Sequence, residues 1–282
     1  MNIKKIVVVG SGTMGSGIAQ AAAESGCAVS LADIDEQRAV AAVDLIRNRL
    51  ERRVAAGRIS AQEKELVLSR ITTIPGLEGC GDAELIIEAA SEQESVKQSL
   101  FRRLDAVAPC SAIFASNTSA ISITRLAAAT EKPERFIGMH FMNPAQVMKL
   151  VEIIPGLRTA PETVTTLIAL CERMGKQPVV VTDAPGFVAN RLLMPAVNEA
   201  IQALQEGLAS REDIDTIMKL GAGHPMGPLE LADFIGLDVC LGILETLHGE
   251  LGEKFRPCPL LRKMVDAGKL GRKSGEGFYD YR

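Results

Sequence analysis

The sequence predicts an α/β protein in which a doubly wound parallel sheet is followed by a smaller all-helical domain. Two observations lead to this fold class. Short apolar, β-branched runs alternate with helical stretches over the first two-thirds of the 282 residues, and strand-like runs almost disappear after residue 183. Apolar residues make up 47% of the chain and charged residues 23%, which is ordinary for a globular protein with a sizeable core.

The strands of the predicted sheet are short runs rich in Val, Ile, Leu and Ala. Seven runs fit this description: Lys5–Val9, Ala28–Ala32, Ala83–Glu88, Ala112–Ser116, Phe136–Phe141, Lys149–Ile154 and Pro178–Thr182. The early runs are continuously apolar rather than alternating. Continuous runs are typical of parallel strands that are buried on both faces.

Helices are expected between these strands. The segment Glu36–Ala56 has an apolar stripe that begins at Val43 and recurs at helical spacing, so it is predicted to be amphipathic. Ser60 followed by Glu63 predicts a capping box at the start of the next helix. Pro161 is expected in the first turn of a later helix, where its missing N–H costs nothing.

The chain divides near residue 183, which gives expected domains of residues 1–183 and 184–282. Four helices are predicted in the second domain: Asn190–Glu206, Arg211–Leu220, Leu229–Leu251 and Pro259–Ala267. No internal repeat or low-complexity tract is visible.

Composition argues against several classes of partner for this chain. The net charge of −4 gives no reason to expect nucleic acid or an anionic membrane, and no apolar run is long enough to cross a bilayer. The first residues show no secretory pattern. The six cysteines form no CxxC pair and no zinc-like cluster with histidine, so we expect reduced thiols, no metal and a cytoplasmic location.

A glycine-rich turn predicts a dinucleotide site. The run Gly10-Ser11-Gly12-Thr13-Met14-Gly15 lies between the first strand and the helix Ser16–Ser25, as in a Rossmann-type fold. The glycines permit a tight turn, close approach of the pyrophosphate and close packing of helix on strand. Asp33 ends the second strand, where a carboxylate accepts hydrogen bonds from a ribose 2′-hydroxyl and repels a 2′-phosphate. NAD is therefore favoured, although Arg38 keeps NADP possible.

His140 and Glu152 are candidates for an acid–base pair. His140 ends one strand-like run and Glu152 lies in the next, so they meet if the loop around Ala145–Met148 reverses the chain. A carboxylate orients an imidazole and stabilises its protonated form, as removal of a hydroxyl proton during hydride transfer requires. The alternatives are a core histidine and a solvated strand-end carboxylate. They are less favoured because Glu152 has apolar neighbours and His140 has polar companions in the same region.

Ordered motifs along the chain resemble the short-chain L-3-hydroxyacyl-CoA dehydrogenase family, which includes bacterial 3-hydroxybutyryl-CoA dehydrogenases. Beyond the glycine turn they are Glu88-Ala-Ala-Ser-Glu92, Ser116-Asn-Thr-Ser119, Met139-His-Phe-Met-Asn-Pro144, Pro185-Gly-Phe-Val-Ala-Asn190-Arg191, His224-Pro-Met-Gly-Pro228 and Gly271-Arg-Lys-Ser-Gly-Glu-Gly-Phe-Tyr279. The resemblance covers nearly the whole chain. Met142 departs from it, because family members commonly have Phe there, and we expect only a packing change.

The resemblance implies roles for individual residues. His140 would be the catalytic acid/base and Glu152 its partner, while Ser119 and Asn190 would hydrogen-bond the substrate oxygen. Asn143 would lie near the nicotinamide and contact substrate. Three further positions match cofactor contacts of the family: Glu92, Lys97 and Lys273. A helical second domain would form most of a homodimer interface.

An arginine-rich helix face is a candidate for binding coenzyme A. Arg49, Arg52 and Arg53 lie at i, i+3 and i+4, and the corresponding helix of the family approaches the CoA phosphates, which suit guanidinium donors. A solvated helix face is an equally good interpretation.

The predicted activity is NAD-dependent interconversion of 3-hydroxyacyl-CoA and 3-ketoacyl-CoA, most simply with a short chain such as 3-hydroxybutyryl-CoA. Three alternatives remain at this point. They are a modified acyl chain such as 3-hydroxyadipyl-CoA, a sugar acid of the gulonate type, and a non-catalytic crystallin-like relative.

Overall fold

The computed structural model describes residues 2–282 and divides into two compact units. The first unit ends at Asp183, and the second comprises Ala184–Arg282. Within residues 2–282, none of the helices has the length and apolar character that crossing a bilayer requires.

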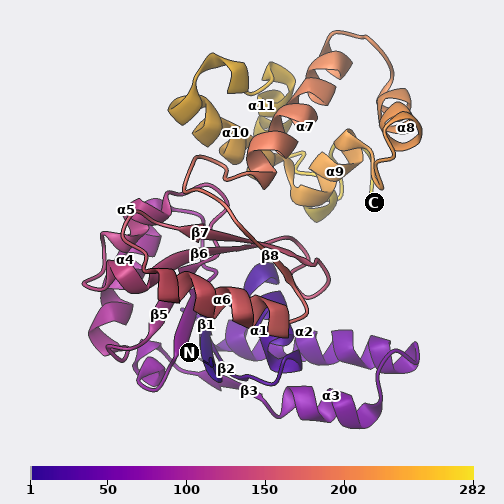
Figure 1. Cartoon of the computed structure of the whole chain (residues 1–282). Helices are drawn as coiled ribbons and strands as arrows, with labels where there is room; N and C mark the ends of the chain where they lie inside the picture. The colour runs from indigo at the N-terminus through magenta and orange to yellow at the C-terminus, as the bar shows by residue number, and fades with distance from the viewer. Residues whose placement is uncertain (1) are drawn as a thin grey trace. The chain divides into compact units, whose positions relative to one another are not determined.

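The first unit is built on an eight-stranded sheet, which confirms the predicted fold class (Figure 1). Its strands are β1 Lys5–Val9, β2 Ala28–Ala32, β3 Ile71–Ile74, β4 Leu85–Glu88, β5 Ile113–Ser116, β6 Phe136–Phe141, β7 Leu150–Pro155 and β8 Gln177–Val180. They lie in the order β3-β2-β1-β4-β5-β6-β7-β8, and all neighbours are parallel except β6 and β7. The order reverses between β1 and β4, and ligands of such sheets bind at that reversal, beyond the carboxyl ends of the strands.

One strand was absent from the sequence-based expectation. β3 has the sequence Ile-Thr-Thr-Ile and pairs with β2 at the edge of the sheet. Only Ile71 is buried, because an edge strand leaves much of its surface exposed. A run of four residues with two threonines therefore gave no apolar pattern long enough to identify it.

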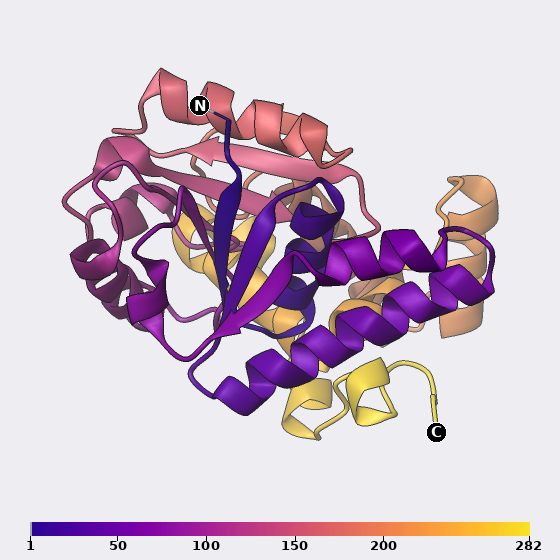
Figure 2. The same ribbon diagram turned by 90° about the horizontal axis from the view of Figure 1, so that it is seen from below.

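Helices cover both faces of the sheet (Figure 2). The first unit contains α1 Thr13–Glu24, α2 Glu36–Ala55, α3 Ala61–Leu68, α4 Glu94–Val107, α5 Ile123–Ala127 and α6 Pro161–Arg173. α1, α2 and α6 share one apolar core with the strands, while Phe101 of α4 packs edge-on against Phe136 on the other face, with ring centroids 4.6 Å apart. The capping box of Ser60 and Glu63 is present, and Pro161 opens α6, as expected.

The second unit is helical. It contains α7 Ala189–Gln205, α8 Arg211–Gly221, α9 Pro228–Ile235, α10 Leu237–Leu251 and α11 Pro259–Asp266, around a core of its own. The prediction of one continuous helix over Leu229–Leu251 was wrong, because the chain breaks at Gly236, where φ is +107°. Glycine suits this turn because residues with a Cβ rarely adopt such a φ.

Candidate active site

The turn between β1 and α1 lies at the reversal of strand order, and each of its glycines has a different role. Gly10 has φ of +100°, and a Cβ there would lie 2.5 Å from the carbonyl oxygen of Ala89. At Gly15, a Cβ would lie 1.7 Å from the carbonyl oxygen of Gly10, so the helix could not pack on the turn. A Cβ at Gly12 meets nothing within 4 Å, which leaves this backbone open to a ligand. The amino end of α1 then presents N–H groups to phosphates.

Asp33 lies directly after β2 and is tied to the glycine turn. Its Oδ2 accepts hydrogen bonds from the backbone N–H and the hydroxyl of Ser11, both at 2.7 Å. Partial burial alone would raise the pKa of Asp33, but the hydrogen bonds from Ser11 and from the backbone N–H groups of Ile34 and Asp35 together outweigh it and hold the pKa below its ordinary value. The carboxylate therefore stays ionised, as an acceptor for ribose hydroxyls must be.

A cavity of about 930 Å³ opens beside this turn. Its wall combines the glycine turn and Asp33 with apolar and basic side chains from three later segments. These include Ile34, Arg38, Leu77, Val96, Leu100 and Arg103. Its size and mixed lining suit the adenosine half of a dinucleotide. Because Arg38 also faces this cavity, a basic side chain lies on the same wall as Asp33.

The antiparallel pairing of β6 and β7 brings the predicted acid–base residues together. His140 and Glu152 are register partners, and His140 Nδ1 lies 2.8 Å from Glu152 Oε2. Both residues are buried, with 5% and 2% of their surface exposed. Burial excludes the solvated strand-end carboxylate that the sequence left possible. A bond at Nδ1 fixes the orientation of the imidazole ring.

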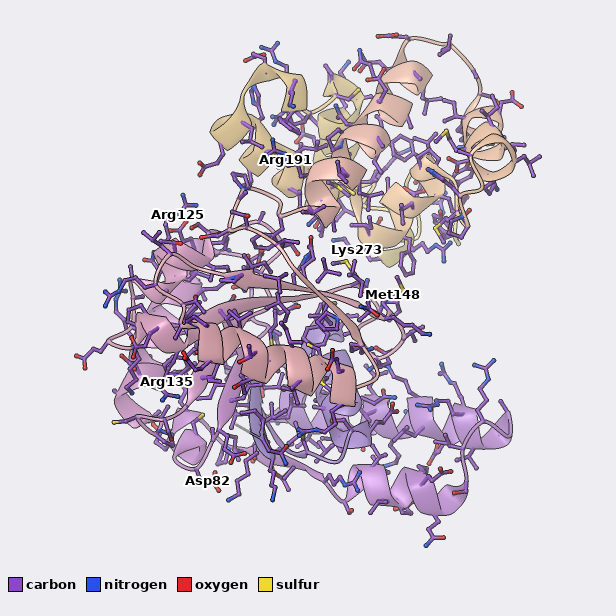
Figure 3. The ribbon with its side chains drawn as sticks, in the orientation of Figure 1. Asp82, Arg125, Arg135, Met148, Arg191 and Lys273 are labelled. Atoms are coloured by element: carbon purple, nitrogen blue, oxygen red, sulfur yellow. The ribbon has the colours of Figure 1, made fainter. Side chains whose placement is uncertain are left out.

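Two residues that the sequence analysis did not single out hold the segment around His140. Asn117, which follows β5, accepts a hydrogen bond from the backbone N–H of Phe141 through Oδ1 at 2.9 Å. Lys176 donates from Nζ to the carbonyl oxygens of Ala145 and Met148, at 2.6 and 2.8 Å, across the loop that joins β6 to β7. Figure 3 labels Met148 in this loop. Both contacts join segments distant in sequence, so no local pattern could reveal them.

Ser119 lies in the loop after β5 and is fixed by a network of charged groups. Its backbone N–H donates to Glu92 Oε1 at 2.6 Å, and the hydroxyl of Thr118 donates to the same oxygen. Lys97 donates to Glu88 at 2.6 Å and lies 3.2 Å from Glu92. Only 1% of the Lys97 side chain is exposed, and the cofactor contact expected for it from the sequence stays a prediction.

The other predicted residues lie in three different places. Asn143, before a cis bond to Pro144, is exposed in the β6–β7 loop. Asn190 is buried in the first turn of α7, in the second unit. Lys273, labelled in Figure 3, is also in the second unit, where Nζ lies 2.5 Å from Asp238 Oδ1. The roles of these residues stay predictions.

The arginine face on α2 is partly occupied by contacts within the first unit. Arg49 donates to the hydroxyl of Ser16 at 3.2 Å, and Arg53 pairs with Glu24 at 2.5 Å, so both bind α1. Arg52 is exposed. Of the three, Arg52 is therefore the best placed to meet a phosphate group from solvent.

The residues of the first unit fit a dinucleotide. The open backbone at Gly12, the ionised carboxylate of Asp33 and the adjoining cavity suit a pyrophosphate, a ribose and an adenine respectively. Within residues 2–282, His, Cys, Asp and Glu form no group of three that could hold a metal ion.

Comparison with known proteins agrees with this geometry. Residues 5–184 match the family described as "3-hydroxyacyl-CoA dehydrogenase, NAD binding domain", and residues 186–281 match "3-hydroxyacyl-CoA dehydrogenase, C-terminal domain". A probable 3-hydroxybutyryl-CoA dehydrogenase of Bacillus subtilis is 52% identical over 282 residues, covering 100% of this chain and 98% of the relative. A 3-hydroxybutyryl-CoA dehydrogenase of Bradyrhizobium diazoefficiens is 51% identical, with coverage of 99% and 96%.

Solved structures give the same result. The crystal structure of the (S)-3-hydroxybutyryl-CoA dehydrogenase PaaH1 from Ralstonia eutropha has a TM-score of 0.95 at 45% identity, with both chains covered completely. The structure of FadB2 from M. tuberculosis has a TM-score of 0.98 at 41% identity, again with complete coverage of both chains.

Proposed function

Since the chain belongs to the 3-hydroxyacyl-CoA dehydrogenase family and is an NAD-dependent enzyme of that class, we propose that its substrate is a short-chain (S)-3-hydroxyacyl-CoA. The 52% and 51% identical relatives named for 3-hydroxybutyryl-CoA support this chain length. The observation that carries the proposed chemistry is the buried 2.8 Å contact between His140 and Glu152 at the carboxyl end of β6.

The dinucleotide would be held by the glycine turn and Asp33. The backbone N–H groups after Gly12 face the pyrophosphate, and Asp33 accepts hydrogen bonds from the adenosine ribose. NAD, when bound, accepts the hydride from C3 of the substrate or returns it. Asn143 remains a proposed contact near the nicotinamide, and Glu92, Lys97 and Lys273 remain proposed contacts of the cofactor.

His140 acts as the acid/base in this proposal. It takes the proton of the substrate's 3-hydroxyl group while the C3–O bond gains double-bond character, and it returns a proton in the reverse direction. Glu152 holds the imidazole through Nδ1 and stabilises its protonated form. Ser119 and Asn190 donate hydrogen bonds to the substrate oxygen, which steadies the charge that develops there.

The coenzyme A portion would meet α2. Arg52, which is exposed, is the proposed phosphate contact, whereas Arg49 and Arg53 bind α1 and would contribute mainly by holding the helix.

A homodimer formed through the second unit completes the proposal. Ile217 and Leu220, three residues apart on α8, have 61% and 83% of their surface exposed, and Leu192 on α7 has 70%. Exposed apolar side chains of this size suit a second copy of the chain. Sedimentation of the Ile217→Glu/Leu220→Glu variant tests this interface, because the dimer should dissociate into monomers.

A cytoplasmic location is also proposed, because the six cysteines are free thiols and disulfides form in oxidising compartments.

A panel of 3-ketoacyl-CoA substrates tests the proposed function. The oxidation of NADH and NADPH is followed with acetoacetyl-CoA, longer homologues, 3-ketoadipyl-CoA and a keto sugar acid. We expect the highest kcat/KM with acetoacetyl-CoA and NADH. A preference for 3-ketoadipyl-CoA would replace the proposed substrate, and absence of turnover with every acyl-CoA would overturn the function.

A further inference from the structure

Asp183 is the last residue of the first unit, and its side chain holds the amino end of α5. Its Oδ2 accepts hydrogen bonds from the hydroxyl of Ser122 at 3.0 Å and from the backbone N–H of Thr124 at 2.8 Å. Its Oδ1 accepts the backbone N–H of Ile123 at 3.0 Å. The two backbone bonds satisfy N–H groups that the first turn of a helix leaves without a partner inside the helix. One carboxylate therefore joins the end of the first unit to three consecutive residues that lie 59 to 61 residues earlier in the chain.

The hydroxyl of Ser122 depends on this carboxylate for its orientation. It donates to Asp183, and its Oγ accepts the backbone N–H of Arg125, labelled in Figure 3, at 3.3 Å. α5 has only five residues, so few hydrogen bonds within the helix keep its first turn in place. Loss of the carboxylate should therefore loosen the whole first turn.

A short loop connects this turn to Ser119. Only two residues separate Ser119 from Ser122, and each can span no more than about 3.6 Å. On its other side the loop is held by Glu92, which accepts the N–H of Ser119 at 2.6 Å. Between these two anchors, Thr118 Oγ1 accepts the N–H of Ile121 at 3.0 Å. A shift of the first turn of α5 would therefore be passed on to Ser119.

Asp183 also lies where the chain leaves the first unit. The next residues form a turn, in which the N–H of Phe187 donates to the carbonyl oxygen of Ala184 at 2.9 Å. Gly186 and Phe187 have φ of +71° and +49°, and a residue with a Cβ keeps such a φ only where its surroundings hold it. The connector to α7, which carries Asn190, is therefore a defined turn, and Asp183 anchors the residue that precedes it.

We propose that Asp183 is a positioning residue for the hydride-transfer reaction, which sets the loop of Ser119 through the first turn of α5 and fixes the point from which the chain continues to Asn190. This inference rests on the proposed roles of Ser119 and Asn190 at the substrate oxygen. Both carboxylate oxygens of Asp183 are engaged by α5, so the residue acts through that turn rather than on a reacting atom. The glycine turn and Asp33 are not part of this network, so loss of Asp183 should affect the chemical step more than the binding of NADH.

The test is a single-turnover reaction of Asp183→Asn in the full chain, loaded with NADH and mixed with acetoacetyl-CoA. Asn keeps the size of the side chain and one acceptor oxygen, but its NH₂ group cannot accept the hydrogen bonds that the second carboxylate oxygen receives. We expect the rate of hydride transfer to fall by about 10- to 100-fold, because small displacements of reacting groups have effects of this size. NADH affinity, measured by NADH fluorescence, should stay within about threefold of wild type, because the groups proposed to bind the adenosine half lie outside the network.

Asp105→Asn is the matched control. Asp105 on α4 accepts the backbone N–H of Glu131 at 2.6 Å and pairs with Lys132 at 3.2 Å, so it too is a carboxylate that holds a loop of the first unit. That loop follows α5, whereas the loop of Ser119 precedes it. Asp105→Asn should lower the Tm and leave the rate of hydride transfer unchanged. This control separates loss of a carboxylate that holds a loop from loss of positioning.

Two results would overturn the inference. A folded Asp183→Asn enzyme with the wild-type rate of hydride transfer would show that Asp183 only stabilises α5, and weaker NADH binding at an unchanged rate would place its effect at the cofactor. Should Asp183→Asn not fold, Ser122→Ala removes one of the three hydrogen bonds and should still lower the rate severalfold; a wild-type rate there would refute the link. Failure of the proposed function is distinguishable, because the wild-type enzyme itself would then turn over no 3-ketoacyl-CoA, and the inference would fall with it.

Discussion

The contact between His140 and Glu152 predicts the effect of changing a single atom. Glu152→Gln keeps the shape of the side chain but replaces the charge that faces the imidazole at 2.8 Å. A hydrogen bond to a charged group contributes about 1.5–3 kcal/mol, and we take this as the stabilisation of protonated His140 that Glu152→Gln loses, because the carboxylate binds the charged ring more strongly than the neutral one. Since each 1.36 kcal/mol changes a rate tenfold, kcat for the oxidation of 3-hydroxybutyryl-CoA should fall by about 10- to 150-fold.

The assay is the formation of NADH from (S)-3-hydroxybutyryl-CoA, with NADH affinity and Tm measured on the same preparation. Glu84→Gln is the control, because Glu84 accepts hydrogen bonds from the N–H groups of Lys4 and Lys5, one of them at 2.9 Å, at the amino ends of the strands. It should alter Tm alone. A Glu152→Gln enzyme that is folded and turns over at the wild-type rate would refute the reasoning, and one that fails to fold would make Glu152 structural.

Three further predictions follow from the same structure. Hydrogen bonds hold the pKa of Asp33 below its ordinary value of 3.8, so its ionised form stabilises the fold above that pH. This stabilisation is lost as the pH falls through the folded-state pKa. The Tm difference between wild type and Asp33→Asn should therefore disappear in acid, and a difference that stays constant with pH would contradict the prediction. Lys176→Met removes two hydrogen bonds to the β6–β7 loop and should lower the free energy of unfolding, measured by urea denaturation, by about 1–3 kcal/mol. An unchanged urea midpoint would show that these hydrogen bonds do not stabilise the fold. Gly12→Ala adds a Cβ that meets no protein atom, so Tm should persist while NADH binds about tenfold more weakly; intact binding would place the pyrophosphate elsewhere.

The sequence predicted the elements whose pattern is local. β1, β2 and β6 have the bounds expected from their apolar runs, because strands buried on both faces carry an uninterrupted signal. β3 was missed because it is short and half exposed at the edge. The break at Gly236 was missed because an isolated glycine within an apolar helical pattern does not reveal that the chain must turn there.

In the candidate site, too, contacts between neighbouring strands could be predicted and contacts between distant segments could not. The partnership of His140 with Glu152 could be anticipated because only one loop separates their strands. The sequence assigned no role to Glu88, although it begins one of the family motifs. Ser116 becomes its neighbour through the parallel register of β4 and β5, and Lys97 becomes its neighbour because α4 packs against this end of the sheet. Lys97 was expected at the cofactor from family resemblance alone, and its contacts with Glu88 and Glu92 could not be read from the sequence.

Turnover by His140→Gln tests the central claim most directly. A single-turnover reaction of this variant, loaded with NADH and mixed with acetoacetyl-CoA, measures the chemical step without product release. The account predicts a rate lower by about 10²- to 10⁴-fold, with NADH affinity within about twofold of wild type. A folded variant that transfers hydride at the wild-type rate would contradict it.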